Sequence, residues 1–477
     1  MRTRLVTVAV AALSVWPLAA AAATPSPNKR AAVAAVDRHA AELTRLSDQI
    51  WEYAETALRE HRSSKLLADY AESQGFSVTR NVSGMPTAFV ARFGTGKPVI
   101  GIMGEYDALP GVSQKAQAEK SPLVEGGAGH GCGHNLFGAA SLGAALAIKE
   151  RIAAGKLKGS VIFFGTPAEE AVGGKTFMAR DGVFNEVDVM FAWHPGDTSR
   201  ADMVTAQAMV DLRVEFHGRA AHAAADPWNG RSALDGVEAF THGVNLMREH
   251  MPLSSRVHYV ITDGGDVPNV VPDHAAVWIW ARDQKRSEVE QLYGRLRKIA
   301  EGAALMTETK VDVKLQSGSW EVLLNKTGAQ LLDANLRWIG TPTYTADEDA
   351  FAKKIQAATE VSAVGMDRGI ESLDGQIEEG GSTDVGDVSW VVPTLNLTVV
   401  TAPKATPWHA WPVVATGGMS IGHKGMIVAA KTLAATMVDL YEQPPALRAV
   451  RAEFEQRRGG AVFKAYLPDG PPPLPQE

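Results

Sequence analysis

Short apolar runs alternate with longer stretches of helical spacing through the first part of the chain. In residues 31–57, apolar side chains such as Val33, Val36 and Leu43 recur near the helical period and predict a helix. The same pattern predicts helices at 63–74 and 136–152 and strands at 76–82, 87–93, 99–103, 160–165 and 187–191. Strands that alternate with helices predict an α/β domain with a mainly parallel sheet.

The order of predicted elements changes near residue 204. From there the pattern predicts strand, helix, strand, strand, helix and strand, at 209–216, 231–250, 257–262, 275–281, 287–305 and 310–315. This β-α-β-β-α-β order is the signature of a ferredoxin-like α+β sandwich. We therefore expect residues 204–316 to form a second domain, inserted into an α/β domain made of 28–203 and 317–445.

After the insertion the α/β pattern returns. It predicts a strand at 395–399 and a long helix at 424–441. Residues 446–477 are expected to form a Pro-rich C-terminal tail, extended or mobile over 467–477.

The N-terminus has the pattern of a secretory signal peptide over residues 1–23. Arg2 and Arg4 precede an apolar run at 5–20, and the alanines at 21–23 offer a cleavage site. An uncleaved membrane anchor is the alternative, but the apolar run is short and polar sequence follows at once. We expect a periplasmic or secreted protein without a stable membrane anchor.

Composition narrows the class of protein without identifying its substrate. The 477 residues are 45% hydrophobic and 21% charged, as in ordinary globular proteins. A net charge of -7 argues against nucleic acid as the natural partner. The single cysteine cannot form an internal disulfide bond.

That cysteine, Cys132, stands in a glycine-rich stretch at 126–138 with His130 and His134 two residues away on either side. A predicted helix begins directly after the stretch, and the partial positive charge of a helix N-terminus favours a thiolate. A thiolate and an imidazole on one loop can form half of a metal site. The alternative is a buried, inert cysteine near hydrogen-bonded histidines.

Other metal-binding side chains fall where predicted strands end. Asp107, Glu169, Glu170 and His194 all occupy such positions, and sites in parallel sheets gather at the carboxyl ends of strands. Adjacent carboxylates are costly to hold together without a cation or a proton. A metal ion is therefore the economical explanation. His409, between two tryptophans, is either a further ligand or a packed side chain.

Two other segments have simpler interpretations on their own. His222 is interpreted as a surface or loop histidine of the second domain. Ser382, Thr383 and Asp384 lie in a polar loop that is typical of a turn.

Taken together, the motifs resemble those of the di-metal aminoacylase and carboxypeptidase family, the amidohydrolase subfamily of peptidase family M20. The matching pieces run in family order from about residue 30 to 445 and include G-E-Y-D-A-L-P-G, G-H-G-C-G-H-N, the E-E doublet, W-H-P and S-T-D-V-G-D. The resemblance implies a zinc-peptidase-like α/β metal-binding domain interrupted by a lid domain through which the protein forms a homodimer.

The resemblance also implies a role for each matching residue. Two divalent ions, Zn or Mn, would be bound by Cys132, as a bridging thiolate, and by His134, Glu170, His194 and His409. Glu169 would act as general base and acid, and Asp107 would lie beside the metals. His130 receives no ligand role.

For the substrate side, the resemblance implies that His222 stabilises the oxyanion in the partner subunit's site. Asn269, Arg282, Ser382, Thr383 and Asp384 would contact substrate. The implied activity is hydrolysis of the amide bond in N-acyl or N-aroyl amino acids, with p-aminobenzoyl-glutamate as a candidate. A broader dipeptidase or carboxypeptidase, and a subunit that needs a paralogous partner, are the alternatives.

Overall fold

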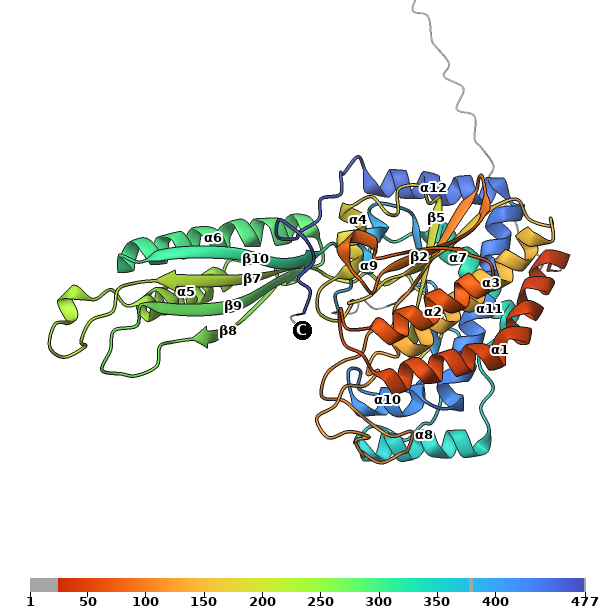
Figure 1. Cartoon of the computed structure of the whole chain (residues 1–477), viewed down its shortest axis with the longest axis horizontal. Coiled ribbons are helices and arrows are strands. Elements are labelled where there is room, and N and C mark those ends of the chain that lie inside the picture. The colour runs from red at the N-terminus through yellow and green to blue at the C-terminus, as the bar shows by residue number, and fades with distance from the viewer. Residues whose placement is uncertain (1–24, 377–380, 476–477) are drawn as a thin grey trace, which may run out of the picture.

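A computed structural model describes residues 25–376 and 381–475 of the chain. Figure 1 shows a large lobe that holds most of the helices and an elongated lobe that projects from it. The predicted signal peptide lies outside the described residues. Among the helices that the structure does describe, none is both long and apolar enough to cross a membrane.

The large lobe is built on a seven-stranded sheet. In spatial order its strands are β1 (Ser77–Arg80), β2 (Phe89–Thr95), β4 (Gly159–Gly165), β3 (Val99–Gly104), β5 (Val189–Gly196), β11 (Thr394–Val400) and β6 (Arg200–Ala201). The four central strands, β4, β3, β5 and β11, are parallel to one another. The outer strands β1, β2 and β6 pair antiparallel.

The prediction of a mainly parallel sheet is therefore correct only for the centre of the sheet. Short loops join β1 to β2 and β5 to β6, and a short connection cannot return the chain to a parallel direction. The buried centre agrees with the continuous apolar runs in the sequence, since every residue of β3 and of β4 is buried.

Ten helices are described in this lobe. They are α1 (Pro27–Tyr53), α2 (His61–Ser73), α3 (His134–Ala153), α4 (Gly174–Arg180), α7 (Lys326–Ile339), α8 (Ala346–Ala358), α9 (Val385–Ser389), α10 (Trp411–Gly417), α11 (Ser420–Glu442) and α12 (Pro444–Arg458). Helix α3 packs against β3, β4 and β5, and α1 and α11 pack on α3. Its side chains from His134 to Ile148 are all buried, as expected for a helix that is apolar on every side.

The elongated lobe, hereafter the lid, confirms the predicted β-α-β-β-α-β order. Its elements are β7 (Ala208–His217), α5 (Ala233–Arg248), β8 (Arg256–Asp263), β9 (His274–Asp283), α6 (Arg286–Thr307) and β10 (Lys310–Ser319). The strands form an antiparallel sheet in the order β10-β7-β9-β8, and α5 and α6 pack against it. Strand β10 continues past the predicted boundary at residue 316, because Ser317 to Ser319 still pair with β7.

The C-terminal region differs from the predicted tail. Residues 444–458 form helix α12, since a proline pair is tolerated in a first helical turn and good helix formers follow it. After the helix the chain reaches the base of the lid. There Phe463 packs against Trp320 and the Lys464 carbonyl accepts a hydrogen bond from the Trp320 indole at 2.9 Å. Tyr466 is buried in the hydrophobic core of the lid.

Candidate metal centre

The loop that carries Cys132 is shaped by the glycine that follows it. Gly133 has a φ of 79°, in the left-handed region, and a Cβ at this position would lie 2.9 Å from Pro195. Glycine avoids both problems. The tight turn places the Cys132 side chain directly before α3, which begins at His134.

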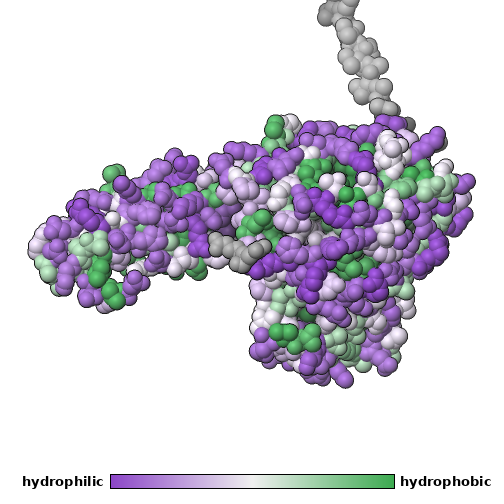
Figure 2. Space-filling view, in the orientation of Figure 1, coloured by the Kyte–Doolittle hydropathy of each residue, from purple (hydrophilic) through white to green (hydrophobic). Residues whose placement is uncertain are grey.

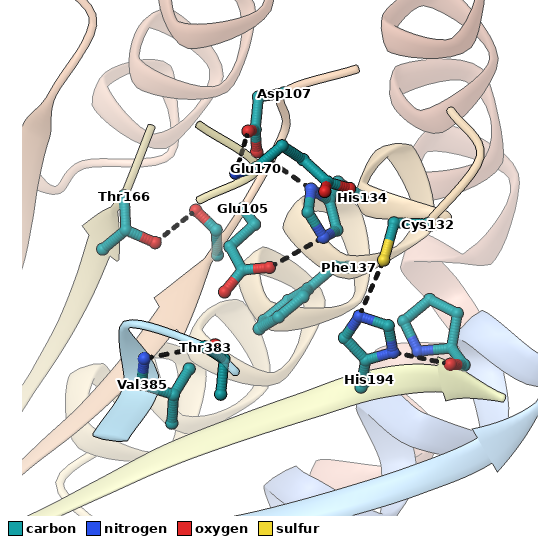
Figure 3. A network of polar contacts seen from close by, with 12 residues as sticks. Glu105, Asp107, Cys132, His134, Phe137, Thr166, Glu170, His194, Thr383 and Val385 are labelled. Atoms are coloured by element: carbon teal, nitrogen blue, oxygen red, sulfur yellow. Dashed lines mark hydrogen bonds and ion pairs between the residues drawn. The ribbon is translucent and has the colours of Figure 1, made fainter. Parts of the chain in front are cut away.

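His134, which is buried, and His194, which is partly buried, are each oriented by one ring nitrogen. His134 Nδ1 donates to Asp107 Oδ1 at 2.9 Å, and His194 Nδ1 donates to the Pro195 carbonyl at 2.7 Å (Figure 3). Each Nε2 is thereby left to face the site. Such hydrogen bonds fix the tautomer and ring direction of metal-binding histidines. His194 Nε2 lies 3.3 Å from Cys132 Sγ.

The predicted ligands form two groups with one member in common. Donor atoms of Cys132, His134 and His194 lie within 4.8 Å of one another, and so do those of Cys132, Glu170 and His409. A thiolate between two such groups can contact two metal ions at once. The structure thus brings all five predicted ligands together around the sulfur.

Asp107 connects the two groups. Its Oδ1 accepts from His134, while its Oδ2 accepts the backbone N–H of Glu170 at 2.9 Å. One carboxylate therefore positions a ligand of each group. This contact pattern fits the predicted position of Asp107 beside the metals.

Strand ends explain why these residues meet. Asp107 follows β3, Glu169 and Glu170 follow β4, and His194 lies near the end of β5. The sequence had predicted that His194 follows its strand. It lies inside β5 instead, because pairing with β11 continues through Gly196. All four central strands point their carboxyl ends at this edge of the sheet.

Two residues at the site have a left-handed backbone although they are not glycine. Ala168, which precedes the glutamate pair, has a φ of 62°, and His409 has a φ of 54°. Such conformations cost about 1–3 kcal/mol and concentrate at functional sites. Both loops are thus held in an unfavourable conformation where they present Glu169, Glu170 and His409.

The electrostatics of the site favour a cation. Burial and the nearby carboxylates of Glu105 and Asp384 raise the pKa of Glu169 well above its usual value. Burial raises the pKa of Glu170 to about 7, partly offset by His134. Burial also raises the pKa of the Cys132 thiol. Each of these groups would be ionised more readily beside a metal ion.

One polar atom of the site also lacks a partner. Among the described residues, Glu170 Oε1 is buried without a hydrogen bond. Buried polar groups rarely remain unsatisfied. Sulfur, imidazole and carboxylate donors are a set that suits zinc and other divalent transition metals. The residues therefore fit metal ions on both the donor set and this unsatisfied atom.

Most of the predicted metal ligands line a cleft of about 740 Å³. Arg282 and Trp280 of the lid line the same cleft, and Ser382, Thr383 and Asp384 also border it. The guanidinium of Arg282 lies 4.8 Å from the centre of the Trp280 ring. The lid thus contributes a cation and an aromatic ring to the cleft.

His222 and Asn269 are not part of this cleft within one chain. Both are exposed on the lid, on neighbouring segments held by a bridge between His222 and Val270 and by a hydrogen bond from Ala223 N–H to the Asn269 carbonyl at 3.0 Å. They do not approach the predicted metal ligands in the cleft of their own subunit.

Two residues that the sequence interpretation did not assign stand at the centre of the site. Glu105 Oε2 lies 3.0 Å from His134 Nε2, and Lys175 Nζ lies 2.7 Å from Glu105 Oε1 and 2.6 Å from Asp384 Oδ1. Lys175 is completely buried. Glu105 stands inside the G-E-Y-D-A-L-P-G motif and Lys175 follows shortly after the E-E doublet, so a charged residue in or near each motif was the available signal.

The sequence of residues 101–410 matches peptidase family M20/M25/M40. The chain belongs to this family and is a metal-dependent hydrolase of amide or peptide bonds.

Among its relatives, the chain is 40% identical to one of the subunits of p-aminobenzoyl-glutamate hydrolase from Escherichia coli, over 92% of this chain and 98% of that protein. It is 31% identical to the Xaa-Arg dipeptidase of Mus musculus, over 90% and 92% of the two chains. A dinuclear metal-binding M20 peptidase of Bacillus subtilis shares the fold, with a TM-score of 0.59, 19% identity and coverage of 85% and 99%.

Proposed function

We propose that this chain hydrolyses the amide bond of N-acyl or N-aroyl amino acids, with p-aminobenzoyl-glutamate as the candidate substrate. The observation that carries the proposal is the pair of ligand groups that share Cys132 in the cleft. The p-aminobenzoyl-glutamate hydrolase relative, similar over nearly its whole length, supports the choice of substrate.

Two divalent ions, zinc or manganese, would be held by the five ligands. Cys132 would contribute its sulfur to both positions, His134 and His194 would complete one, and Glu170 and His409 the other. When bound, such ions lower the pKa of a coordinated water and polarise the amide carbonyl.

The protein groups then manage protons and orientation. Glu169, which lines the cleft next to Glu170, would take the proton of the attacking water and pass it to the leaving amine. Arg282 is placed to pair with a substrate carboxylate, since it is a lid cation that lines the cleft beside Trp280. Ser382 and Thr383 border the cleft as hydrogen-bonding groups.

His222 would act from a partner subunit, because it is exposed and outside the cleft of its own chain. The lid offers a surface for a second copy. Strand β8 is an edge of the lid sheet and carries exposed Val260 and Ile261, and Figure 2 shows apolar patches on this lobe. Edge strands readily pair with another chain. A homodimer through the lids would place His222 for oxyanion stabilisation.

Two alternatives have support of their own. Relatives named as two different subunits of one hydrolase favour a heteromer with a paralogous partner. The Xaa-Arg dipeptidase relative favours a broader dipeptidase. Native mass measurement separates homodimer from heteromer, and a panel of N-acyl amino acids and dipeptides separates the substrate classes.

We also propose export to the periplasm or medium, on the basis of the N-terminal pattern. The mass of the mature protein from its host tests this proposal. A chain that retains residues 1–23 would contradict it.

The central test is Glu169→Ala in protein loaded with zinc or manganese. We expect turnover of p-aminobenzoyl-glutamate to fall by about 10²–10⁴-fold while metal content is unchanged. Surviving activity would contradict the role of Glu169. Wild-type protein with bound metal and no activity on any member of the panel would contradict the substrate class and favour the heteromer.

A further inference from the structure

A buried ion network lies behind the predicted metal ligands. Lys175 Nζ donates to Asp384 Oδ1 at 2.6 Å and lies 2.7 Å from Glu105 Oε1. The Lys175 backbone N–H donates to the other Asp384 oxygen at 2.8 Å. All three side chains are almost completely buried. Removing one partner from such a network leaves an uncompensated buried charge.

The network joins two parts of the site that are remote in sequence. On one side, the second oxygen of Glu105 faces His134 Nε2 at 3.0 Å. On the other side, Asp384 ends the polar segment 381–384 that borders the cleft and directly precedes α9. The Asp384 side chain makes no capping bond to α9 and instead accepts from the N–H at the start of α4.

Lys175 also fixes one end of the loop that carries the glutamate pair. The loop runs from the end of β4 at Gly165 to the start of α4 at Gly174. Two other backbone N–H groups of the loop also donate to carboxylates: Ala168 N–H donates to Glu60 and Glu170 N–H donates to Asp107, both at 2.9 Å. Lys175 is the anchor at the α4 end.

We propose that Lys175 is a positioning residue that couples the metal-binding histidine to the substrate-side segment, by holding Glu105 against His134 and Asp384 at the base of residues 381–384. The network has two arms: the Glu105 arm, which controls metal retention, and the Asp384 arm, which controls the conformation of the cleft wall. Only the effect of the Asp384 arm on substrate rests on the proposed hydrolase function.

The test uses Lys175→Met, which keeps side-chain length and removes the charge. Lys353→Met is the matched control, because Lys353 is half-exposed and its ion pair with Asp349 is on the surface. We expect Lys175→Met to weaken zinc affinity about 10-fold or more by calorimetry, the size of effect typical of groups that orient metal ligands. At saturating zinc, KM should rise about 10-fold, and the control should match wild type in both measurements.

Two single variants separate the arms. Glu105→Gln should weaken zinc affinity and leave KM at saturating zinc unchanged. Asp384→Asn should raise KM, leave zinc affinity unchanged and speed hydrogen exchange of the amides in 385–389.

Wild-type zinc affinity and KM in Lys175→Met would overturn the proposal. If Lys175→Met does not fold, unchanged zinc affinity in Glu105→Gln together with unchanged KM and hydrogen exchange in Asp384→Asn would overturn it equally. Zinc affinity and hydrogen exchange need no substrate. Failure of wild-type hydrolysis would therefore contradict the proposed function and leave both arms of this test intact.

Discussion

The large lobe and the lid present their candidate functional residues in different ways. In the large lobe, five ligands from separate strand ends and loops meet around the Cys132 sulfur, and two of them, Cys132 and His134, are buried. In the lid, His222 and Asn269 are exposed on the surface and outside the cleft of their own chain, whereas Arg282 lines it. The comparison teaches that one chain brings all the predicted ligands together by itself, whereas it leaves His222 and Asn269 outside the cleft that the ligands line.

Substituting the sulfur tests the self-contained half of this comparison. Cys132→Ser removes the one donor common to both ligand groups. Since even groups that only orient ligands are worth about 10–100-fold in metal affinity, we expect a loss beyond about 100-fold. Metal analysis and calorimetry measure it. His423→Asn, which changes a histidine paired with Asp48 away from the site, should bind metal normally. Unchanged metal content in Cys132→Ser would show that sulfur is not a ligand.

Substituting the lid histidine tests the other half. His222→Ala should lower kcat about 10²–10³-fold, as loss of an oxyanion donor does, and leave metal content unchanged. If the histidine acts in the partner subunit's site, mixing His222→Ala with Glu169→Ala protein should recover activity that neither has alone. A mixture as inactive as its components would place His222 in its own chain's site or outside the reaction.

The link between the two lobes can be weakened without touching either set of residues. Tyr466 is buried in the lid core although it belongs to the C-terminal segment after α12. Tyr466→Ala should destabilise the protein by about 3–5 kcal/mol in urea unfolding, the usual cost of truncating a buried aromatic side chain. Zinc affinity should be unchanged. Leu474→Ala, at a half-exposed position, is the control. Reduced zinc affinity in Tyr466→Ala would mean that the metal centre depends on the lid.

A paired carboxylate of the large lobe provides the contrast to the glutamates of the site. Burial raises the pKa of Glu348, but hydrogen bonds from Lys424 and Ser420 outweigh it and lower the pKa to about 2. The carboxylate also completes the capping box of α8. The stability it contributes is present above the unfolded pKa of about 4.3 and is lost as pH falls towards 2.

Glu348→Gln should therefore cost about 1–2 kcal/mol at pH 7, and the difference from wild type should vanish on acidification. Urea unfolding between about pH 2 and about pH 7, a range that covers the folded pKa of about 2 and the unfolded pKa of about 4.3, measures it. A difference that is constant with pH would assign the effect to packing and not to charge.

The sequence carries enough information for the fold and for the types of residue at the site. Hydrophobic periodicity predicts the central strands, and the carboxyl ends of parallel strands meet by geometry, so Asp107, Glu170 and His194 could be expected together. Periodicity does not report strand direction at the sheet edges. Periodicity also did not reveal α12. A proline pair usually indicates the end of a helix, and here it stands in the first turn of one, where proline is tolerated.

Only the tertiary structure decided which residues far apart in the sequence contact one another. Glu105, Lys175 and Asp384 are separated by 70 and 209 positions, and no local pattern in the sequence indicates that their charges meet. The division of the ligands into two groups around Cys132 is likewise a matter of distance between loops. Local sequence sets backbone conformation over a few residues, whereas ion pairs and metal ligands depend on where the packed core carries the ends of its strands.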